Sequence, residues 1–295
     1  MTSISHLPTV DWAMAPAEIV DALQRASRRI ETPCGDGGMV WRLWGAGPPL
    51  VLLHGGFGSW THWIRNIPAL AARYTVVAAD LPGLGDSADA PLPHTVENLG
   101  AILIDGLQAV VPPPTPFRVV GFSFGSVLGG HIAVASGARV PAFVGVGASA
   151  LGLRRHAVEG LRLERSGMTD AEIDAMHRRN LEILMIADPV RVDPLAVYVY
   201  RRNLASACVR SRRISMSDSL ARILPRVRAR LMGIWGEHDV TAFGQIAPRR
   251  ALFESIQPGC PFVVIPGAGH WVMYEAAEKF NVALLEMLAA VDRAA

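Results

Sequence analysis

The sequence predicts an α/β fold in which a mostly parallel, doubly wound sheet carries helices on both faces. Short apolar runs that stop at glycine recur along the chain, and such runs are typical of strands buried on both faces. Segments with helical periodicity separate most of these runs, and this alternation favours a parallel sheet. The alternation stops once, from Leu151 to about Leu224, where we expect a helical insertion after the sixth strand.

The first element expected is an amphipathic helix over Ala17–Ile30, because apolar residues recur there at helical spacing. Helices are also expected over Val96–Val110 and Glu275–Leu288. The strand-like runs are Met39–Gly45, Pro49–Gly56, Tyr74–Gly83, Phe117–Ser123, Ala142–Ala148, Ala229–Gly236 and Pro261–His270.

These elements divide the chain into three parts. We expect an N-terminal extension with a helix (1–38), an α/β core (39–150 and 229–295) and a helical cap (151–228). The cap is basic, since Leu151–Arg230 holds sixteen Arg against nine Asp and Glu. The arginines suit planar, bidentate binding of carboxylates. The chain has a single lysine, so the excess of arginine could instead reflect a GC-rich genome and not carboxylate binding.

The composition of the chain argues against several classes of function. The 295 residues are 51% hydrophobic and 18% charged, with a net charge of +2, which gives no case for nucleic-acid binding. Three cysteines without paired spacing predict neither a disulfide framework nor a zinc site. The N-terminus does not read as a signal peptide, and the apolar stretch near residues 119–151 contains His131, Arg139 and Pro141. We therefore expect a cytoplasmic protein, not bound to membranes, that acts on a small molecule without metal or cofactor.

The stretch "GFSFG" places Ser123 directly after a buried strand, with a glycine two residues away on either side. A nucleophile on a very tight strand-to-helix turn leaves no room for Cβ atoms at these positions, so Gly121 and Gly125 fit that need. The strained turn would expose the serine hydroxyl at the tip of the following helix.

Two further strand ends carry the partners that a serine nucleophile requires. Asp239 follows the strand of "LMGIWG", and His270 follows the strand of "VVIPGAG". The chain order is Ser, Asp, His, as in nucleophile-elbow hydrolases. We expect His270 to take the Ser123 proton and return it to the leaving group, while Asp239 holds the imidazole tautomer. Asp80 also ends a strand, but we interpret it as structural.

A fourth element, "HGG", follows the first buried strand. Backbone N–H groups that are fixed in advance stabilise an oxyanion, and the expected donors are the amides of Gly56 and Phe124. His54 is interpreted as a hydrogen-bonded anchor of this loop.

Together, these motifs resemble the α/β-hydrolase superfamily from about Met39 to the C-terminus. The resemblance implies the α/β-hydrolase fold and a serine hydrolase that acts on a small ester or related activated carbonyl. A homodimer is expected at the level of the family. The motifs that carry the resemblance are "LLHGG", "DLPGLGDS", "VGFSFG", "WGEHD" and "PGAGHW".

Three other stretches are similar to the meta-cleavage-product hydrolases, which cut C–C bonds in carboxylated diketones. They are "GSWTHWIRNIPALA", "MIADPVRVDPLAVYVYRRNL" and the tryptophan after the histidine. The resemblance implies that cap residue Arg201 or Arg202 binds the substrate carboxylate, although both could instead lie on a solvated helix face. We also expect Phe57, Phe122 and Trp271 to line the pocket, with packing in the core as the other interpretation of Phe57 and Trp271. Phe122 departs from that branch, which has asparagine there, and "HGGFGSW" is shorter than its oxyanion loop.

Three functions therefore remain open from the sequence. The first is a serine hydrolase of small esters, with or without a carboxylate group, and the second is a C–C bond hydrolase. The third is a ligand-binding homologue without catalysis, since fold does not imply function.

Overall fold

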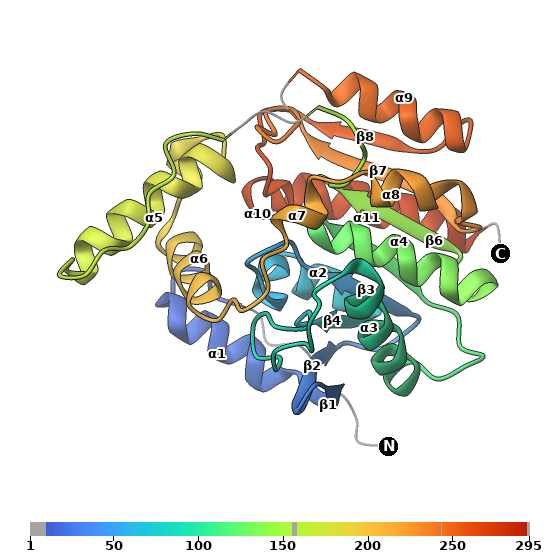
Figure 1. Cartoon of the computed structure of the whole chain (residues 1–295), viewed down its shortest axis with the longest axis horizontal. Coiled ribbons are helices and arrows are strands. Elements are labelled where there is room, and N and C mark those ends of the chain that lie inside the picture. Colours follow the sequence, from blue (N-terminus) through green and yellow to red (C-terminus); the bar gives the residue numbers. More distant parts are fainter. Residues whose placement is uncertain (1–9, 155–157, 243, 294–295) are drawn as a thin grey trace.

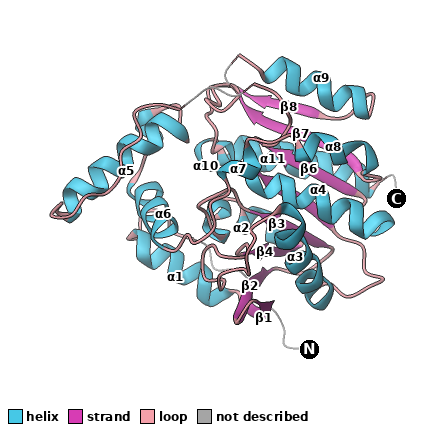
Figure 2. Cartoon of the chain, viewed as in Figure 1, coloured by secondary structure: helices cyan, strands magenta, loops and turns pink. Residues whose placement is uncertain are grey.

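The structure is a computed structural model that describes residues 10–154, 158–242 and 244–293. Within them, eight strands form one sheet between two layers of helices (Figures 1 and 2). The strands are β1 (Arg28–Cys34), β2 (Gly37–Trp44), β3 (Pro49–Leu53), β4 (Thr75–Ala79), β5 (Arg118–Phe122), β6 (Ala142–Val146), β7 (Arg230–Gly236) and β8 (Phe262–Ile265).

The strand order is β1-β2-β4-β3-β5-β6-β7-β8. The pairs from β4 to β8 are parallel, whereas β1 pairs with β2, and β2 with β4, in antiparallel fashion. The predicted fold class, a mostly parallel sheet with helices on both faces, is thus confirmed. Parallel strands end at one edge of the sheet, so the loops that follow β3, β5, β7 and β8 can converge there.

Beyond their first residues, the central strands are apolar because both faces of the sheet are covered. In β3, Leu50 and Leu52 pack into one core, while Val51 and Leu53 pack into the core on the opposite face. Successive side chains of a strand point to opposite faces, so a continuous apolar run feeds both cores.

The helices form a layer on each face of the sheet (Figure 1). Those whose residues join the first core include α1 (Pro16–Ala26), α2 (Ile67–Ala71), α10 (Val272–Glu275) and α11 (Ala277–Asp292). Those that join the second include α3 (Val96–Val110), α4 (Phe124–Ser136), α8 (Ser219–Ile223) and α9 (Ile246–Ile256). None of the described helices is long and apolar enough to cross a membrane.

The segment that follows the sixth strand, β6, consists of helices and loops in its described residues. It holds α5 (Asp170–Leu184), α6 (Pro194–Ala205), α7 (Arg212–Ser215) and α8. Figure 1 shows α5 and α6 standing to one side of the sheet, with α1 beside α6. We call residues 151–228 the inserted segment below.

The structure differs from the prediction at the N-terminal end. The first helix ends at Ala26 instead of Ile30, and the sheet starts at Arg28, not at Met39. The edge strand β1 is mostly exposed, with only Thr32 and Cys34 fully buried. A polar edge strand lacks the apolar run on which the prediction depends, so sequence periodicity did not reveal it.

Candidate active site

Ser123 lies between β5 and α4 in a left-handed backbone conformation, with φ of 48° and ψ of −113°. A Cβ atom on Gly121 would lie 2.6 Å from the carbonyl oxygen of Gly125, and one on Gly125 would lie 2.4 Å from the carbonyl oxygen of Leu53. No side chain fits at such distances, so both glycines are needed for the turn. The tight turn expected from "GFSFG" is therefore present.

His270 and Asp239 form a buried hydrogen-bonded pair, with 2.9 Å between His270 Nδ1 and Asp239 Oδ2. Asp239 Oδ1 accepts from the backbone N–H and the hydroxyl of Thr241, each at 2.8 Å. Burial alone would raise the pKa of Asp239, but the charge and hydrogen bond of His270, together with Thr241, outweigh burial and lower it. An ionised Asp239 keeps the proton of His270 on Nδ1 and leaves Nε2 free to act as a base.

The loops after β7 and β8 hold this pair together through backbone contacts. The N–H of His238 donates to the carbonyl of Ala268 over 2.8 Å. A Cβ on Gly236 would lie 2.1 Å from the carbonyl oxygen of Gly269, so the two loops approach closely only because residue 236 is glycine. The carboxylate and the imidazole therefore come from two adjacent strand ends of one rigid sheet.

Ser123 and His270 line one cavity of about 380 Å³. The described residues show no hydrogen bond between the Ser123 hydroxyl and His270; such bonds often form only when substrate is bound. No cluster of His, Cys, Asp or Glu in the described ranges could hold a metal ion. The cavity is lined by Gly55, Gly56, Phe57, Phe122, Ser123, Val158, Leu161, Leu184, Met185, Ser211, Arg212, Ser215, Met216, Thr241 and His270.

Two histidines hold the peptide that carries the Gly56 amide. His54 Nδ1 lies 2.7 Å from the carbonyl oxygen of Gly55, and this oxygen belongs to the same peptide as the Gly56 N–H. Since a carbonyl can only accept, His54 Nδ1 carries the proton. On the other side, the Gly55 N–H donates to His62 Nδ1 over 3.2 Å. The amides of Gly56 and Phe124 form no backbone hydrogen bond outside helices and strands in the described chain, so both can donate to a ligand.

Burial keeps both histidines neutral. It lowers the pKa of His54 to about 4, despite the opposing effect of the Gly55 carbonyl. Burial also lowers the pKa of His62 well below its usual value, and His54 and His270 add to this effect. The sequence predicts His54 as a loop anchor but gives no signal for His62. Its position in "SWTHW" resembles that of a core residue, and only the folded loop brings it to Gly55.

Asp80, the other carboxylate at a strand end, organises a loop. Its Oδ1 accepts from the N–H of Trp60 over 2.7 Å, and its Oδ2 from the N–H of Asp86 over 3.0 Å. Burial raises its pKa to about 6. Asp80 is not among the residues that line the Ser123 cavity.

Three aromatic residues were expected to line the pocket, and two of them do. Phe57 and Phe122 belong to the cavity wall, and the Phe122 ring lies 4.9 Å from that of His270. Trp271 is fully buried, stacks on Tyr274 at 4.2 Å and donates from Nε1 to the carbonyl of His62. It therefore packs in the core behind the site and is not among the residues that line the Ser123 cavity.

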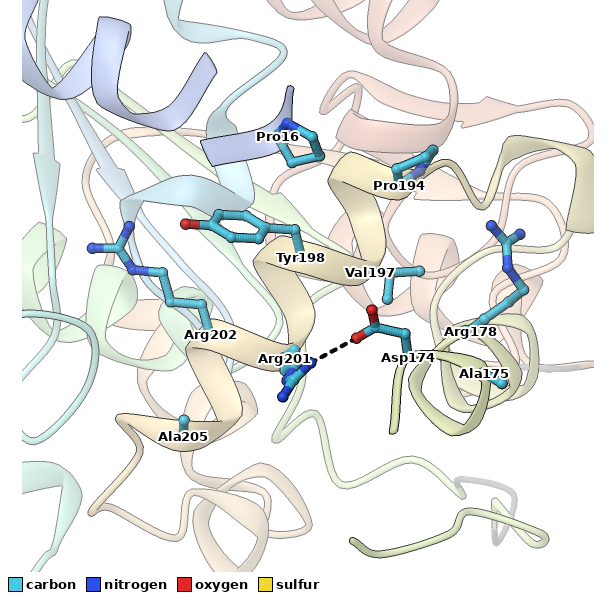
Figure 3. Close-up of a pocket in the computed structure, with 10 residues that line it drawn as sticks. All are labelled: Pro16, Asp174, Ala175, Arg178, Pro194, Val197, Tyr198, Arg201, Arg202 and Ala205. Atoms are coloured by element: carbon cyan, nitrogen blue, oxygen red, sulfur yellow. Dashed lines mark hydrogen bonds and ion pairs between the residues drawn. The ribbon is translucent and has the colours of Figure 1, made fainter. Parts of the chain in front are cut away.

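The structure does not bring Arg201 and Arg202 to the Ser123 cavity. Arg201 pairs with Asp170 and Asp174 at 2.6 and 3.0 Å, and Arg202 lies 3.9 Å from Asp86. Figure 3 shows both on α6, at a second cavity of about 720 Å³ that also reaches α5 and the start of α1. The expectation that one of them binds substrate beside Ser123 is not supported by this arrangement, because chain position alone does not tell which way a side chain points.

Arg212 is the basic residue that lines the Ser123 cavity. It begins α7, is exposed, and has no ion pair in the described ranges. No motif distinguishes Arg212 in the sequence from the many other arginines of the inserted segment. A guanidinium without a carboxylate partner at the cavity wall can receive an anionic group of a ligand.

The inserted segment is joined to the loop that carries His270. The Glu275 carboxylate accepts from the N–H groups of Gly269 and Ala187, at 2.6 and 3.1 Å. The N–H of Trp271 donates to the carbonyl of Met185 over 2.7 Å. Since Met185 lines the cavity, these hydrogen bonds join this part of the cavity wall to the loop that carries His270.

Comparison with known proteins places this geometry in context. The sequence profile of the alpha/beta hydrolase family matches residues 50–283. The chain is 29% identical, over 82% of its length, to the dihydrolipoyllysine-residue acetyltransferase component of the acetoin cleaving system of Pseudomonas putida, and it spans 64% of that protein. It is 27% identical to the 2-hydroxy-6-oxononadienedioate/2-hydroxy-6-oxononatrienedioate hydrolase of Paraburkholderia phymatum, over 81% of the chain and 86% of the relative. The carboxylesterase of Bacillus subtilis shares the fold, with a TM-score of 0.69, 18% identity, and coverage of 93% and 98%.

The close contacts at the turn give a prediction for stability. Replacing Gly125 by alanine forces a Cβ against the carbonyl oxygens of Leu53 and His54. We expect the free energy of unfolding, measured by urea titration, to fall by at least about 2 kcal/mol, because backbone cannot move aside as a flexible side chain can.

Gly100→Ala is the matched control. Gly100 also lies within a helix, α3, but its Cβ would meet only His131 Cβ at 3.9 Å. Alanine there should leave stability unchanged or raise it by up to about 1 kcal/mol. Equal stability losses in the two variants would contradict the account of the turn.

Proposed function

Because the chain belongs to the alpha/beta hydrolase family, we propose that it is a serine hydrolase that cleaves a small ester or related activated carbonyl through an acyl-enzyme. The observation that carries the proposal is the buried His270–Asp239 pair at 2.9 Å, at the same cavity as a serine on a strained turn. A nucleophile, a base and an orienting acid at one strand edge are what acyl transfer requires.

In the proposed reaction, Ser123 Oγ attacks the carbonyl carbon while its proton passes to His270 Nε2. The negative charge that develops on the carbonyl oxygen is stabilised by the N–H groups of Gly56 and Phe124. When the C–O bond to the leaving group breaks, the leaving oxygen takes the proton from His270. Water then repeats the sequence on the acyl-enzyme and releases the acid. Asp239 stabilises the imidazolium in both halves of the reaction.

The cavity lining supports a substrate with an apolar body and one anionic group. Phe57, Phe122, Leu184 and Met185 supply apolar wall, and Arg212 is the cation that faces it. A carboxylate paired with Arg212 would satisfy both charges. We propose a small carboxylated ester as the preferred substrate class.

The first prediction of this proposal concerns the nucleophile. Ser123→Ala should reduce ester turnover by at least about 10⁴-fold, since the covalent step is lost, while the unfolding transition stays intact. Steady-state hydrolysis of a p-nitrophenyl ester and a thermal melt measure the two effects. Turnover that survives in this variant would rule out Ser123 as the nucleophile.

The second prediction concerns the anionic end of the substrate. Arg212→Met should raise KM for a carboxylated ester by about tenfold, as expected for the loss of a charge-assisted hydrogen bond at an exposed site. KM for a neutral ester of the same size should change by less than about twofold. Arg213→Met is the control, because Arg213 is the exposed neighbour outside the cavity lining. Equal effects of Arg212→Met on both esters would count against carboxylate recognition.

A C–C bond hydrolase is the second candidate, favoured by the similarity to the Paraburkholderia phymatum enzyme over 86% of that relative. The test is the visible absorbance of a 2-hydroxy-6-oxo-2,4-dienoate substrate. Bleaching by the wild type but not by Ser123→Ala would assign C–C cleavage. A stable absorbance, with ester turnover intact, would exclude C–C cleavage and support the esterase proposal.

A further inference from the structure

Ser211 is a buried hydroxyl that the mechanism above does not use. Its side chain is 3% exposed and belongs to the lining of the Ser123 cavity. Its Oγ has no hydrogen-bond partner in the described part of the chain, and it does not cap the α7 helix that follows it. A hydroxyl in a cavity wall can donate a hydrogen bond to a ligand that the cavity holds.

The backbone around Ser211 is fixed to the core on both sides. The N–H groups of Cys208 and Val209 donate to the carbonyl of Gly83 over 2.9 and 3.3 Å, and Val209 is buried against Gly83. Further along, the N–H of Ala150 donates to the carbonyl of Ser215 over 3.0 Å. Ser211 is therefore held in advance by contacts with the loops after β4 and β6, as a preorganised group requires.

The Ser211 hydroxyl lies directly against the oxyanion loop. A Cβ atom on Gly56 would lie 2.1 Å from Ser211 Oγ and 3.3 Å from Ser211 Cβ, so the serine occupies the space that a side chain at position 56 would need. The same point lies 3.9 Å from the Cβ of Phe124. The hydroxyl is thus beside Gly56, whose amide is one of the two proposed oxyanion donors and whose Cβ position lies near Phe124, the other.

We propose that Ser211 is a third oxyanion donor, supplied by the inserted segment. This inference rests on the proposed function and deepens it. As Ser123 Oγ bonds to the carbonyl carbon, the Ser211 hydroxyl donates a hydrogen bond to the carbonyl oxygen and keeps its own proton throughout. The bond strengthens as charge develops on that oxygen, because hydrogen bonds to anions are stronger than those to neutral acceptors. Ser211 is a catalytic residue in this role, since it touches the reacting oxygen.

The test compares Ser211→Ala with the wild type on a neutral p-nitrophenyl ester. We expect kcat to fall by about 100-fold while KM stays within about twofold, because the contact is stronger in the transition state than in the ground state. The Ki of a trifluoromethyl ketone, which forms a tetrahedral adduct with a serine nucleophile, should rise by a similar factor. A thermal melt should show an unchanged Tm, so that a folding defect is separated from a catalytic one.

Ser206→Ala is the control variant. Ser206 lies in the same inserted segment, but its hydroxyl donates to the carbonyl of Asn203 and it is absent from the cavity lining. Its kcat, KM and Ki should match those of the wild type.

Two outcomes would overturn the inference alone. An unchanged kcat in Ser211→Ala, with turnover abolished in Ser123→Ala, would show that the hydroxyl does not act on the oxyanion. A raised KM with unchanged kcat and Ki would assign it to ground-state binding instead. Turnover that survives in Ser123→Ala would overturn the proposed function and this inference with it.

Discussion

The site depends on a backbone turn that only glycines permit. A non-glycine residue at φ of 48° costs about 1–3 kcal/mol, so contacts around Ser123 must hold it in place. The close approach of β3 to α4 at Gly125, and of β5 to the same turn at Gly121, supplies these contacts. Because β3, β5, β7 and β8 belong to one sheet, the fixed turn also fixes the position of Ser123 relative to His270 and Asp239. The packing of the parallel strands therefore maintains the strained backbone conformation of Ser123.

The protonation states of the residues around this turn are fixed by burial and hydrogen bonds. Asp239 is held ionised by its hydrogen-bond donors, while burial holds His54 and His62 neutral with opposite roles at their Nδ1 atoms. These two imidazoles fix both sides of Gly55 and so orient the Gly56 N–H before substrate arrives. The inserted segment completes the cavity through contacts at Glu275 and Gly83. Core and insertion therefore build one site together.

The parallel sheet and the strand ends that carry the candidate site could be predicted from apolar patterns in the sequence. Buried parallel strands are continuous apolar runs in the sequence. Ser123, Asp239 and His270 each follow such a run, so their position at one edge of the sheet could be predicted. The edge strand β1 could not, because its exposed residues carry no apolar pattern. The residues of the inserted segment that line the cavity could not be predicted either. Among its fifteen arginines, only tertiary packing decides that Arg212, not Arg201, lines the Ser123 cavity. Ser211 and His62 likewise depend on loop paths that no local pattern specifies.

The central claim is that the strained turn presents Ser123 as a covalent nucleophile to the cavity. The most direct measurement is intact-protein mass spectrometry after reaction with a fluorophosphonate, followed by peptide mapping of the adduct. The account predicts a mass increase of one phosphonyl group, located on the peptide that contains Ser123 and absent from Ser123→Ala. An adduct on a different residue, or no adduct in a protein that still hydrolyses esters, would contradict it.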